Sequence, residues 1–577
     1  MSTERPEIQG SQFAVSTGHY YSSQAAFEVL QAGGNATDAG VAAGLALGVL
    51  QSDLVSVAGV APIIVWDAER AEMQTISGLG GWPKAADIDY FRRKHNGAIP
   101  IGPMRTVIPS APAAWIMALD RYGTMSFGDV AHYAVRFARD GFPMNALLRQ
   151  TITQNRENYL AYPHAAAIYL PKDGQPVEIG ELFYQKELGA SLQYMIDQEA
   201  TALSNGADRK AGLQAARNAF YKGDLAKAFT DYHKDVGGWL TMQDLAEFRV
   251  ALEPPVSSGF GDWQVFGCGP WCQGPALMEK LNLLKRFDLK GMGHNSADYI
   301  HAQVEATKLV MADRDAYFGD PRYIDVPIET LLSEEYADAQ MARIKMGEAF
   351  PEMPPPGDAS GNPWRGANVP SPVTDNPHPG GALDTTYLCV ADSKGNVFSA
   401  TPSDGSYNGA VVPGTGMNVS PRGVQSWTDP SHPSSIAPGK RPRLTPNPAI
   451  AVRDNGKAFL PFGTPGGDVQ TQAMAQTFAN VAVFGMGPQE AVEAPRFASY
   501  SFPSSFEPHD YHPGLLRLEG KVDRAAGDDL AGRGHRIDWW PDRTWLAGSI
   551  CMILDDRETG MKAAGADPRR VAYALGW

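Results

Sequence analysis

Cysteine is scarce in this chain, with only four thiols among 577 residues. So few cysteines exclude a disulfide-stabilised secreted scaffold and fit a reducing compartment. Cys268 and Cys272, which have three residues between them, could form a metal or redox pair, but no second pair of matching spacing accompanies them. The sequence favours buried free thiols and leaves the paired alternative open.

Concentrated positive charge and long apolar runs are also missing. The net charge of −15 at pH 7 argues against binding to nucleic acid or to an anionic membrane surface. The apolar stretch 39–50 is too short and glycine-rich to cross a bilayer, so we expect a buried helix there. The first residues show no basic segment followed by an apolar one, hence no secretory signal. We expect a cytoplasmic protein.

The hydrophobic fraction of 43% and the charged fraction of 20% are those of an ordinary globular protein. Hydrophobic periodicity predicts a mostly helical first half with strands near its start. The predicted helices cover residues 22–31, 35–50, 113–139, 182–203 and 296–317, and the early strands cover 12–16 and 55–66. Beyond residue 384 we expect strands at 385–391, 396–401, 447–453 and 457–462, and a helix at 470–484.

A segment rich in proline and glycine, residues 351–384, separates these two parts. A stretch of that length without periodicity is usually functional or a linker. Thr385 follows it, and cleavage between Asp384 and Thr385 would make the threonine an N-terminus. Its hydroxyl would then be a nucleophile with its own α-amino group as base, since such an amine has a pKa of roughly 7.7–8.0. Taken alone, Thr385 could also be the β-branched start of a strand.

Two later segments carry polar groups that this chemistry needs. Residues 401–409 are rich in hydroxyl groups and can return to the start of the preceding strand. Gly466 and Gly467 lie between a predicted strand and a predicted helix, where successive backbone N–H groups can stabilise an oxyanion. Taken alone, the glycine pair is also compatible with an ordinary strand-to-helix turn.

Together these segments resemble the γ-glutamyltranspeptidase family of N-terminal-nucleophile hydrolases, and the resemblance covers nearly the whole chain. Each motif is weak by itself, but all of them occur in the order that the family has. The segments that carry the resemblance are Gly33-Gly34-Asn35-Ala36-Thr37-Asp38-Ala39, Val107-Ile108-Pro109-Ser110, Leu119-Asp120-Arg121-Tyr122-Gly123, Ala138-Arg139-Asp140-Gly141-Phe142, residues 312–321, Thr385-Thr386 with Asp392 and Gly395-Asn396, Pro465-Gly466-Gly467, and residues 490–497.

The resemblance implies an α/β fold of the α+β kind, a four-layer αββα sandwich with two mostly antiparallel sheets between helices. It also implies a precursor that cuts itself, with Thr385 attacking the Asp384 carbonyl. The products would be a large subunit, 1–384, and a small subunit, 385–577, which together build one structural domain. Whether the protein forms a homo-oligomer is left open.

The implied reaction is attack of mature Thr385 on an amide of a small molecule, through an acyl-enzyme. Gly466 and Gly467 would hold the oxyanion, and Ser403 matches a second hydroxyl that hydrogen-bonds the nucleophile. Thr401 could assist, or could simply be a β-branched strand residue. No cofactor or metal is expected, because nucleophile, base and oxyanion donors are all protein groups. Water or an acceptor amine could receive the acyl group.

The chain departs from the family pattern where the γ-glutamyl group is held. Residues 77–85 lack the family's arginine, Gly405 replaces an asparagine, residues 420–425 lack an acidic pair, and Leu444-Thr445 replace paired serines. Burying a charged group without partners costs several kcal/mol, so we expect poor binding of γ-glutamyl compounds. Candidate substrate-binding residues are Trp82, Thr401, Tyr407, Arg422 and Thr445, with Trp427 as a further apolar wall; surface or core packing is the alternative for the aromatic residues.

Our prediction is therefore a self-cleaving N-terminal-threonine amidohydrolase that acts on an amide other than a γ-glutamyl compound. The alternatives are a γ-glutamyltransferase or glutathione hydrolase with a different substrate grip, and an inactive binding or scaffold relative. His509 and His512 could form a metal site, but the flanking prolines favour a loop and no third ligand is evident.

Overall fold

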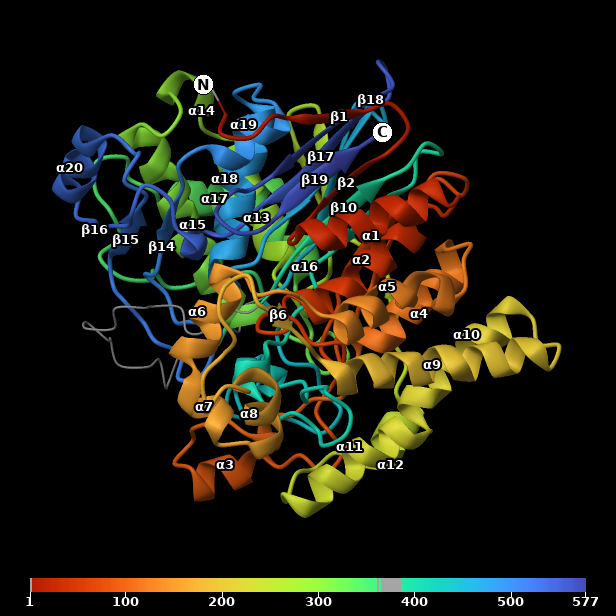
Figure 1. The fold of residues 1–577 in the computed structure, drawn as a ribbon. Helices are drawn as coiled ribbons and strands as arrows, with labels where there is room; N and C mark the ends of the chain where they lie inside the picture. Colours follow the sequence, from red (N-terminus) through yellow and green to blue (C-terminus); the bar gives the residue numbers. More distant parts are fainter. Residues whose placement is uncertain (1–2, 361–362, 365–384) are drawn as a thin grey trace.

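The computed structural model describes residues 3–360, 363–364 and 385–577. Two seven-stranded sheets lie face to face, and helices cover the outer face of each (Figure 1). This is the four-layer αββα sandwich expected from the sequence. No helix in these ranges is both long enough and apolar enough to cross a membrane.

In the first sheet the strand order is β1-β18-β17-β13-β12-β9-β8, and neighbours are antiparallel. Its strands are β1 (Ile8–Gly10), β8 (Val256–Phe260), β9 (Trp263–Gly267), β12 (Ala449–Arg453), β13 (Ala458–Gly463), β17 (Cys551–Asp556) and β18 (Met561–Ala566).

In the second sheet the order is β19-β2-β10-β11-β3-β4-β7, again antiparallel throughout. Its strands are β2 (Ala14–Thr17), β3 (Ile63–Asp67), β4 (Glu72–Ile76), β7 (Leu252–Glu253), β10 (Leu388–Ala391), β11 (Val397–Ala400) and β19 (Tyr573–Gly576). Both sheets interleave strands from before residue 384 with strands from after it.

Helices from the first part of the chain share one apolar cluster with β2, β10 and β11. They are α1 (Tyr20–Gln31), α2 (Ala36–Leu50), α4 (Ala111–Tyr122), α5 (Phe127–Asp140), α6 (Ala146–Gln154), α7 (Arg156–Leu160), α8 (Pro163–Tyr169), α9 (Lys186–Ser204), α10 (Arg209–Tyr221), α11 (Asp224–Asp235) and α12 (Met242–Glu247). Figure 1 shows α1, α2 and α5 on the opposite side of the sheets from α13, α15 and α18.

The second helical layer packs on β9, β12 and β13. Its helices are α13 (Gly274–Leu284), α14 (Leu289–Met292), α15 (Ala297–Tyr317), α16 (Ile328–Leu331), α17 (Glu334–Met341), α18 (Gln470–Ala482), α19 (Pro488–Glu493) and α20 (Arg524–Gly532). The remaining elements are α3 (Ile88–Lys94), the 3₁₀ turns η1 (Pro103–Arg105), η2 (Ser406–Asn408), η3 (Arg422–Gln425), η4 (Gly467–Val469) and η5 (Trp545–Ala547), and strands β5 (Phe142–Pro143), β6 (Leu182–Phe183), β14 (Phe497–Ser499), β15 (Leu515–Leu518) and β16 (Arg536–Trp539).

Between the sheets lies a third apolar cluster, to which Cys389 and Ile450 contribute from facing strands. All four cysteines are buried free thiols, which confirms that interpretation for Cys268 and Cys272. Helix α2 is buried along its whole length, as its small residues predict. A Cβ placed on Gly40 would lie 2.2 Å from the Phe398 ring, so only glycine allows α2 to approach β11 this closely.

Three predicted elements differ from the structure. Residues 55–62 form turns and extended chain rather than strand, because Ser56 and Val60 bond to the backbone of Ser403 instead of to a neighbouring strand. The single helix predicted over 113–139 is broken at Gly123, whose N–H caps α4. Residues 182–183 form a short strand, and the helix predicted to begin there begins at Lys186.

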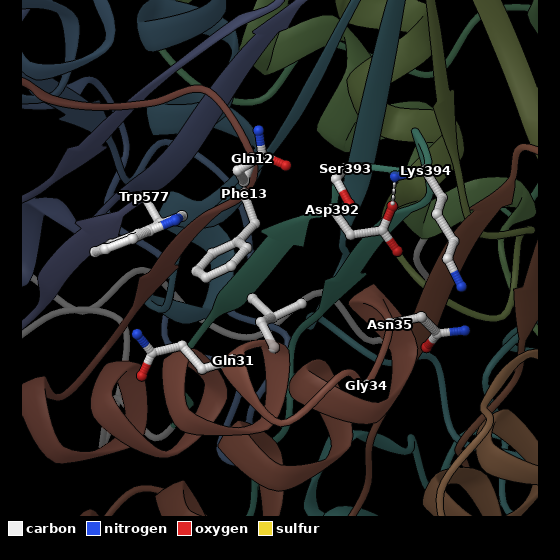
Figure 2. A pocket seen from close by; sticks show the side chains of 10 residues that line it. Gln12, Phe13, Gln31, Gly34, Asn35, Asp392, Ser393, Lys394 and Trp577 are labelled. Carbon is white, nitrogen blue, oxygen red and sulfur yellow. Dashed lines mark hydrogen bonds between the residues drawn. The ribbon is translucent and has the colours of Figure 1, made fainter.

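Asp392 fastens the turn between β10 and β11 to the start of α2. Its carboxylate accepts hydrogen bonds from the N–H groups of Ala36, Lys394 and Asn396 and from the Asn396 side chain, each 2.9 Å long. Asn35 and Asp38 form a capping box on the same helix. These contacts explain why two motifs far apart in sequence occur together. Figure 2 shows Asp392 beside a cavity of about 420 Å³, at the opposite end of β10 from Thr385.

Replacing Asp392 with alanine should lower the free energy of unfolding by about 2–4 kcal/mol, because four hydrogen bonds to a nearly buried carboxylate are lost and their donors left unsatisfied. Urea unfolding monitored by circular dichroism measures this. The control is Asp529→Ala, which removes a half-exposed ion pair with Arg533 and should cost under about 1 kcal/mol. Equal losses in the two variants would contradict the anchoring role of Asp392.

Candidate active site

Thr385 lies three residues before β10, fully buried, and its Oγ1 atom is 2.7 Å from the Oγ atom of Ser403. The antiparallel register, in which Leu388 faces Ala400, brings the start of β10 to the end of β11. Ser403 is held in turn by hydrogen bonds to Val60 and Ser56. The structure therefore brings together the predicted nucleophile and the predicted second hydroxyl.

The backbone of Thr385 is held on both sides. Its N–H donates to the Leu54 carbonyl at 2.9 Å, and its carbonyl accepts from Arg570 Nη1 at 3.1 Å. Its φ angle is 116°, a value that β-branched residues rarely adopt. Such conformations cost roughly 1–3 kcal/mol and gather at functional sites. Asp384, on the other side of the predicted cleavage point, lies outside the described residues.

A buried ion pair stands next to the two hydroxyl groups. Arg422 Nη2 donates to Ser403 Oγ at 2.6 Å, and Arg422 Nε donates to Asp404 Oδ1 at 2.7 Å. Ser420 also donates its hydroxyl to Asp404. A guanidinium can only donate, so the Ser403 hydroxyl oxygen accepts from Arg422. In the contact between Ser403 and Thr385 either hydroxyl can be the donor.

Gly466 and Gly467 lie in the loop that leaves β13 at the Thr385 end of the sandwich. Gly463, the last residue of β13, contacts the Tyr387 ring so closely that a Cβ there would be 2.4 Å from it. The φ angles of Gly466 and Gly467 are 128° and 56°, which explains the need for glycine at both positions. The loop then enters η4 and α18, the strand-to-helix transition that the sequence predicts.

Asp468, which follows the two glycines, holds this loop in place through buried hydrogen bonds. Its carboxylate accepts from Arg314 Nη1 at 2.6 Å, from Gln273 Nε2 at 2.6 Å, and from the backbone and hydroxyl of Ser505, both at 2.7 Å. Burial raises the pKa of Asp468, but Arg314 and Ser505 outweigh it and leave the pKa below its usual value. Asp468 is therefore an anion held in place by fixed donors.

The same network reaches the long helix α15, which supplies Arg314 and Asp315. Asp315 Oδ1 accepts from Arg443 Nη2 at 2.8 Å and from Arg314 Nη2 at 3.0 Å. All three side chains are almost fully buried. The α15 motif thus orients the loop around Gly466, a positioning role that its sequence does not reveal.

The weaker candidates are arranged around this centre. The Thr445 hydroxyl accepts from Gln425 Nε2 at 2.9 Å, and Gln425 Oε1 accepts from Arg422 Nη1 at 3.4 Å. Trp82 is buried and donates its indole N–H to Ser426 at 2.9 Å. Tyr407 lies in the apolar core of the first helical layer. Thr401 is buried, with its N–H bonded to Pro62. The substrate-binding roles of these residues, Arg422 included, stay predictions.

Sequence reasoning missed three residues that are adjacent to Thr385 or to Ser403. Asp404 is adjacent to Ser403, but its pairing with Arg422 depends on a turn eighteen residues later. Leu54 contributes only a carbonyl oxygen, which leaves no residue-type signal. Arg570 comes from the C-terminal part of the chain, and only the tertiary fold brings it to Thr385.

His509 and His512 belong to no group of three potential metal ligands among the residues that the structure describes. The His509 ring stacks on Trp427 at 3.9 Å between centroids, and burial lowers its pKa to about 4. Among the residues that the structure describes, the side chains that could together hold a metal are His301, Glu305 and His535. There Lys308 Nζ already pairs with Glu305 at 2.7 Å, so a cation of the protein occupies the carboxylate.

The fold places the chain among the N-terminal-nucleophile hydrolases. A cephalosporin acylase from Bacillus halodurans, of known structure, superposes with a TM-score of 0.84 at 26% identity, covering 100% of this chain and 98% of that one. The gamma-glutamyltranspeptidase family model matches residues 22–577, and the chain belongs to this family.

Two relatives match over nearly their whole length. The acylase ACY 1 proenzyme of Pseudomonas sp. (strain SE83) is 30% identical over 585 residues, which is 99% of this chain and 96% of the relative. The glutathione hydrolase-like YwrD proenzyme of Bacillus subtilis (strain 168) is 30% identical over 574 residues, 99% of both chains. The family resemblance read from the motifs is confirmed.

Asp468→Asn should destabilise the protein most at neutral pH. Because the folded-state pKa of Asp468 is lowered, its stabilising contribution is present above the unfolded value of roughly 3.9 and is lost as the pH falls through the folded value. We expect a gap of about 2 kcal/mol between wild type and variant at pH 7, shrinking below about pH 4.

Urea unfolding at several pH values tests this prediction. The control is Asp454→Asn, at the half-exposed turn between β12 and β13. A gap for Asp468→Asn that is independent of pH, or no larger than that of the control, would rule out the anionic anchor.

Proposed function

We propose that this chain is a self-cleaving N-terminal-threonine amidohydrolase whose substrate is not a γ-glutamyl compound. The observation that carries the proposal is the 2.7 Å contact between Thr385 Oγ1 and Ser403 Oγ, in a protein whose relatives are acylases and hydrolases. A nucleophile, a hydroxyl that orients it, and a glycine loop at the same end of the sandwich form a set suited to acyl transfer.

Maturation begins with attack of Thr385 Oγ on the Asp384 carbonyl carbon. The C–N bond breaks, the nitrogen of Thr385 takes the hydroxyl proton, and an ester joins the two residues. Water then hydrolyses the ester to a carboxylate and a free Thr385. The left-handed φ of Thr385 supports this step, because backbone strain at a scissile bond is released by cleavage. The two curated relatives are named proenzymes.

In the mature enzyme the α-amine of Thr385 accepts the Oγ proton as Oγ attacks the amide carbonyl of the substrate. The backbone N–H groups of Gly466 and Gly467 receive the oxyanion. The ammonium then gives its proton to the leaving amine, and an acyl-enzyme remains. Ser403, itself held by Arg422, keeps Thr385 Oγ in one orientation through both half-reactions.

The charges around the nucleophile support an acyl group without a carboxylate. The Ser403 hydroxyl lies between Arg422 and Thr385. The positive charge of Arg422 is already matched by Asp404 inside the protein. Both side chains are almost completely buried. The carboxylate that pairs with Arg422 is thus supplied by the chain itself. A neutral site of this kind favours neutral acyl groups, because a second buried anion would lack a partner.

A glutathione hydrolase with a different substrate grip remains the second candidate, since the YwrD relative is as similar as the acylase. Comparing γ-glutamyl p-nitroanilide with an uncharged acyl p-nitroanilide separates the two. Turnover of the γ-glutamyl compound at an equal or higher kcat/KM would favour this second candidate. The retained Thr385–Ser403 contact argues against an inactive scaffold.

Thr385→Ala should leave the chain uncut and reduce turnover at least about 10⁴-fold, because both nucleophile and base chemistry are lost. The wild type should show two bands on a denaturing gel, with the smaller band beginning at Thr385 by N-terminal sequencing. Thr385→Ser, which keeps a hydroxyl, is the matched control and should still cleave. A cleaved and active Thr385→Ala protein would disprove the proposed mechanism.

Asp404→Asn should shift specificity toward anionic acyl groups. The amide retains an acceptor for Arg422, but the guanidinium charge is then unmatched and can attract a substrate carboxylate. We expect the kcat/KM ratio of glutaryl to butyryl p-nitroanilide to rise about tenfold, equivalent to about 1.4 kcal/mol. Asp454→Asn, on a remote turn, is the control for a general change in charge. An unchanged ratio in an active Asp404→Asn enzyme would show that Arg422 does not influence acyl selection.

A further inference from the structure

Asp53 and Leu54 are buried residues next to Thr385, the proposed nucleophile. The Leu54 carbonyl accepts the N–H of Thr385 at 2.9 Å, and Asp53 is the preceding residue. The Asp53 backbone also lies against Gly405, where an added Cβ would come within 2.1 Å of its carbonyl oxygen. Asp53 is therefore packed between the nucleophile and the segment that carries Ser403.

The carboxylate of Asp53 is buried with little to compensate its charge. The residue is 1% exposed, and neither oxygen has a hydrogen-bond partner of normal geometry among the described residues. Burial raises its pKa to about 6, while Arg570 and the Thr151 hydroxyl lower it in part. Burying an anion with so few hydrogen bonds and so little opposite charge costs free energy. The Asp53 carboxylate is therefore only partly neutralised by its surroundings.

The groups that face this carboxylate come from several elements. Thr151 lies on α6, Tyr159 on α7 and Tyr169 on α8, and Arg570 approaches from the segment before β19. Burial raises the pKa of both phenols, so they stay neutral near pH 7. Arg570 acts on both groups, because its positive charge lowers the pKa of Asp53 and its Nη1 donates to the Thr385 carbonyl at 3.1 Å.

We propose that Asp53 and Arg570 are a positioning pair for the mature nucleophile: Arg570 fixes the Thr385 carbonyl, and Asp53 supplies the negative charge that balances the Thr385 ammonium. This inference rests on the proposed function. In each half-reaction the amine takes a proton from Thr385 Oγ or from water and then returns it to the leaving group. The amine therefore gains and loses one positive charge per step, while the oxyanion carries the matching negative charge.

The arrangement explains why an unmatched carboxylate is tolerated. Before cleavage the nitrogen of Thr385 is an uncharged amide, and among the described residues Arg570 is the positive charge that lowers the pKa of Asp53. After cleavage the Thr385 nitrogen becomes an amine that can carry a positive charge. It would stay hydrogen-bonded to the carbonyl of Leu54, the residue that follows Asp53. Arg422 near Thr385 is matched by Asp404. Without Asp53, the charge of Arg570, which contacts the Thr385 carbonyl, would disfavour protonation of the amine, since like charges oppose each other.

Asp53→Asn tests the pair through the pH dependence of kcat/KM, measured on matured enzyme with an uncharged acyl anilide. The acid limb of this profile reports the base of the free enzyme, here the Thr385 amine. Loss of the negative charge should lower the amine pKa, so the acid limb should move to lower pH by about one unit. The plateau should fall about tenfold, because a weaker base removes the Oγ proton less readily.

Asp53→Glu, which retains the charge, is the matched control and should keep the limb within about 0.3 units of wild type. An Asp53→Asn profile that loses height without moving, or moves to higher pH, would overturn the counter-charge role. If Asp53→Asn does not mature, the Asp53→Glu variant provides the test. An acid limb of its kcat/KM profile at the wild-type pH, with at least a tenth of the wild-type activity, supports the proposal. A displaced acid limb or a lower activity contradicts it.

Thr385→Ala, assayed in parallel, separates this inference from the proposed function. If Thr385→Ala is inactive and the Asp53→Asn limb does not move, the counter-charge role alone fails. If Thr385→Ala turns over substrate like wild type, the amine is not the base and the proposed function itself fails.

Discussion

The antiparallel pairing of β10 with β11 is the constraint on which the rest of the site depends. Its register, with Leu388 opposite Ala400, sets Thr385 and Ser403 side by side, and Asp392 fixes the turn at the other end by binding the start of α2. A slip of one residue would turn every side chain to the other face of the sheet and separate the two hydroxyl groups. The proposed chemistry therefore depends on the register of β10 and β11, which the contacts of Asp392 help to fix.

Buried charge is the second organising feature, and it serves position more than stability. Arg314, Asp315, Arg443 and Asp468 form one network under the glycine loop, and Arg422 with Asp404 forms another beside Ser403. A buried ion pair contributes little net stability compared with apolar packing of the same volume. Its donors and acceptors nevertheless have fixed directions, which apolar contacts lack. Such networks suit loops that must present backbone N–H groups in one orientation.

The sequence predicted many of the helices and strands, because hydrophobic periodicity and the small residues of α2 are local signals, whereas the layered architecture was implied by the family resemblance. It also placed Thr385 at the start of a strand and Ser403 after the next one. It failed at residues 55–62, whose β-branched composition suggested a strand while their hydrogen bonds go to Ser403. It could not reveal Asp404 as the partner of Arg422, or Asp53 and Arg570 beside Thr385. Those contacts join separate segments of the sequence, and residue types alone do not predict them.

In the proposed mechanism, reaction chemistry and substrate selection would occupy different parts of this site. Thr385, Ser403 and the glycine loop depend on strand ends and on the α15 network, which are built into the core. We propose that selection depends on the turns that carry Asp404, Arg422 and Thr445, where a changed side chain alters charge without disturbing a sheet. Because Asp404 already matches Arg422 within the protein, the site keeps a cation near the nucleophile without offering it to a substrate. A family can thus retain one reaction while its acyl specificity changes through a few buried charges.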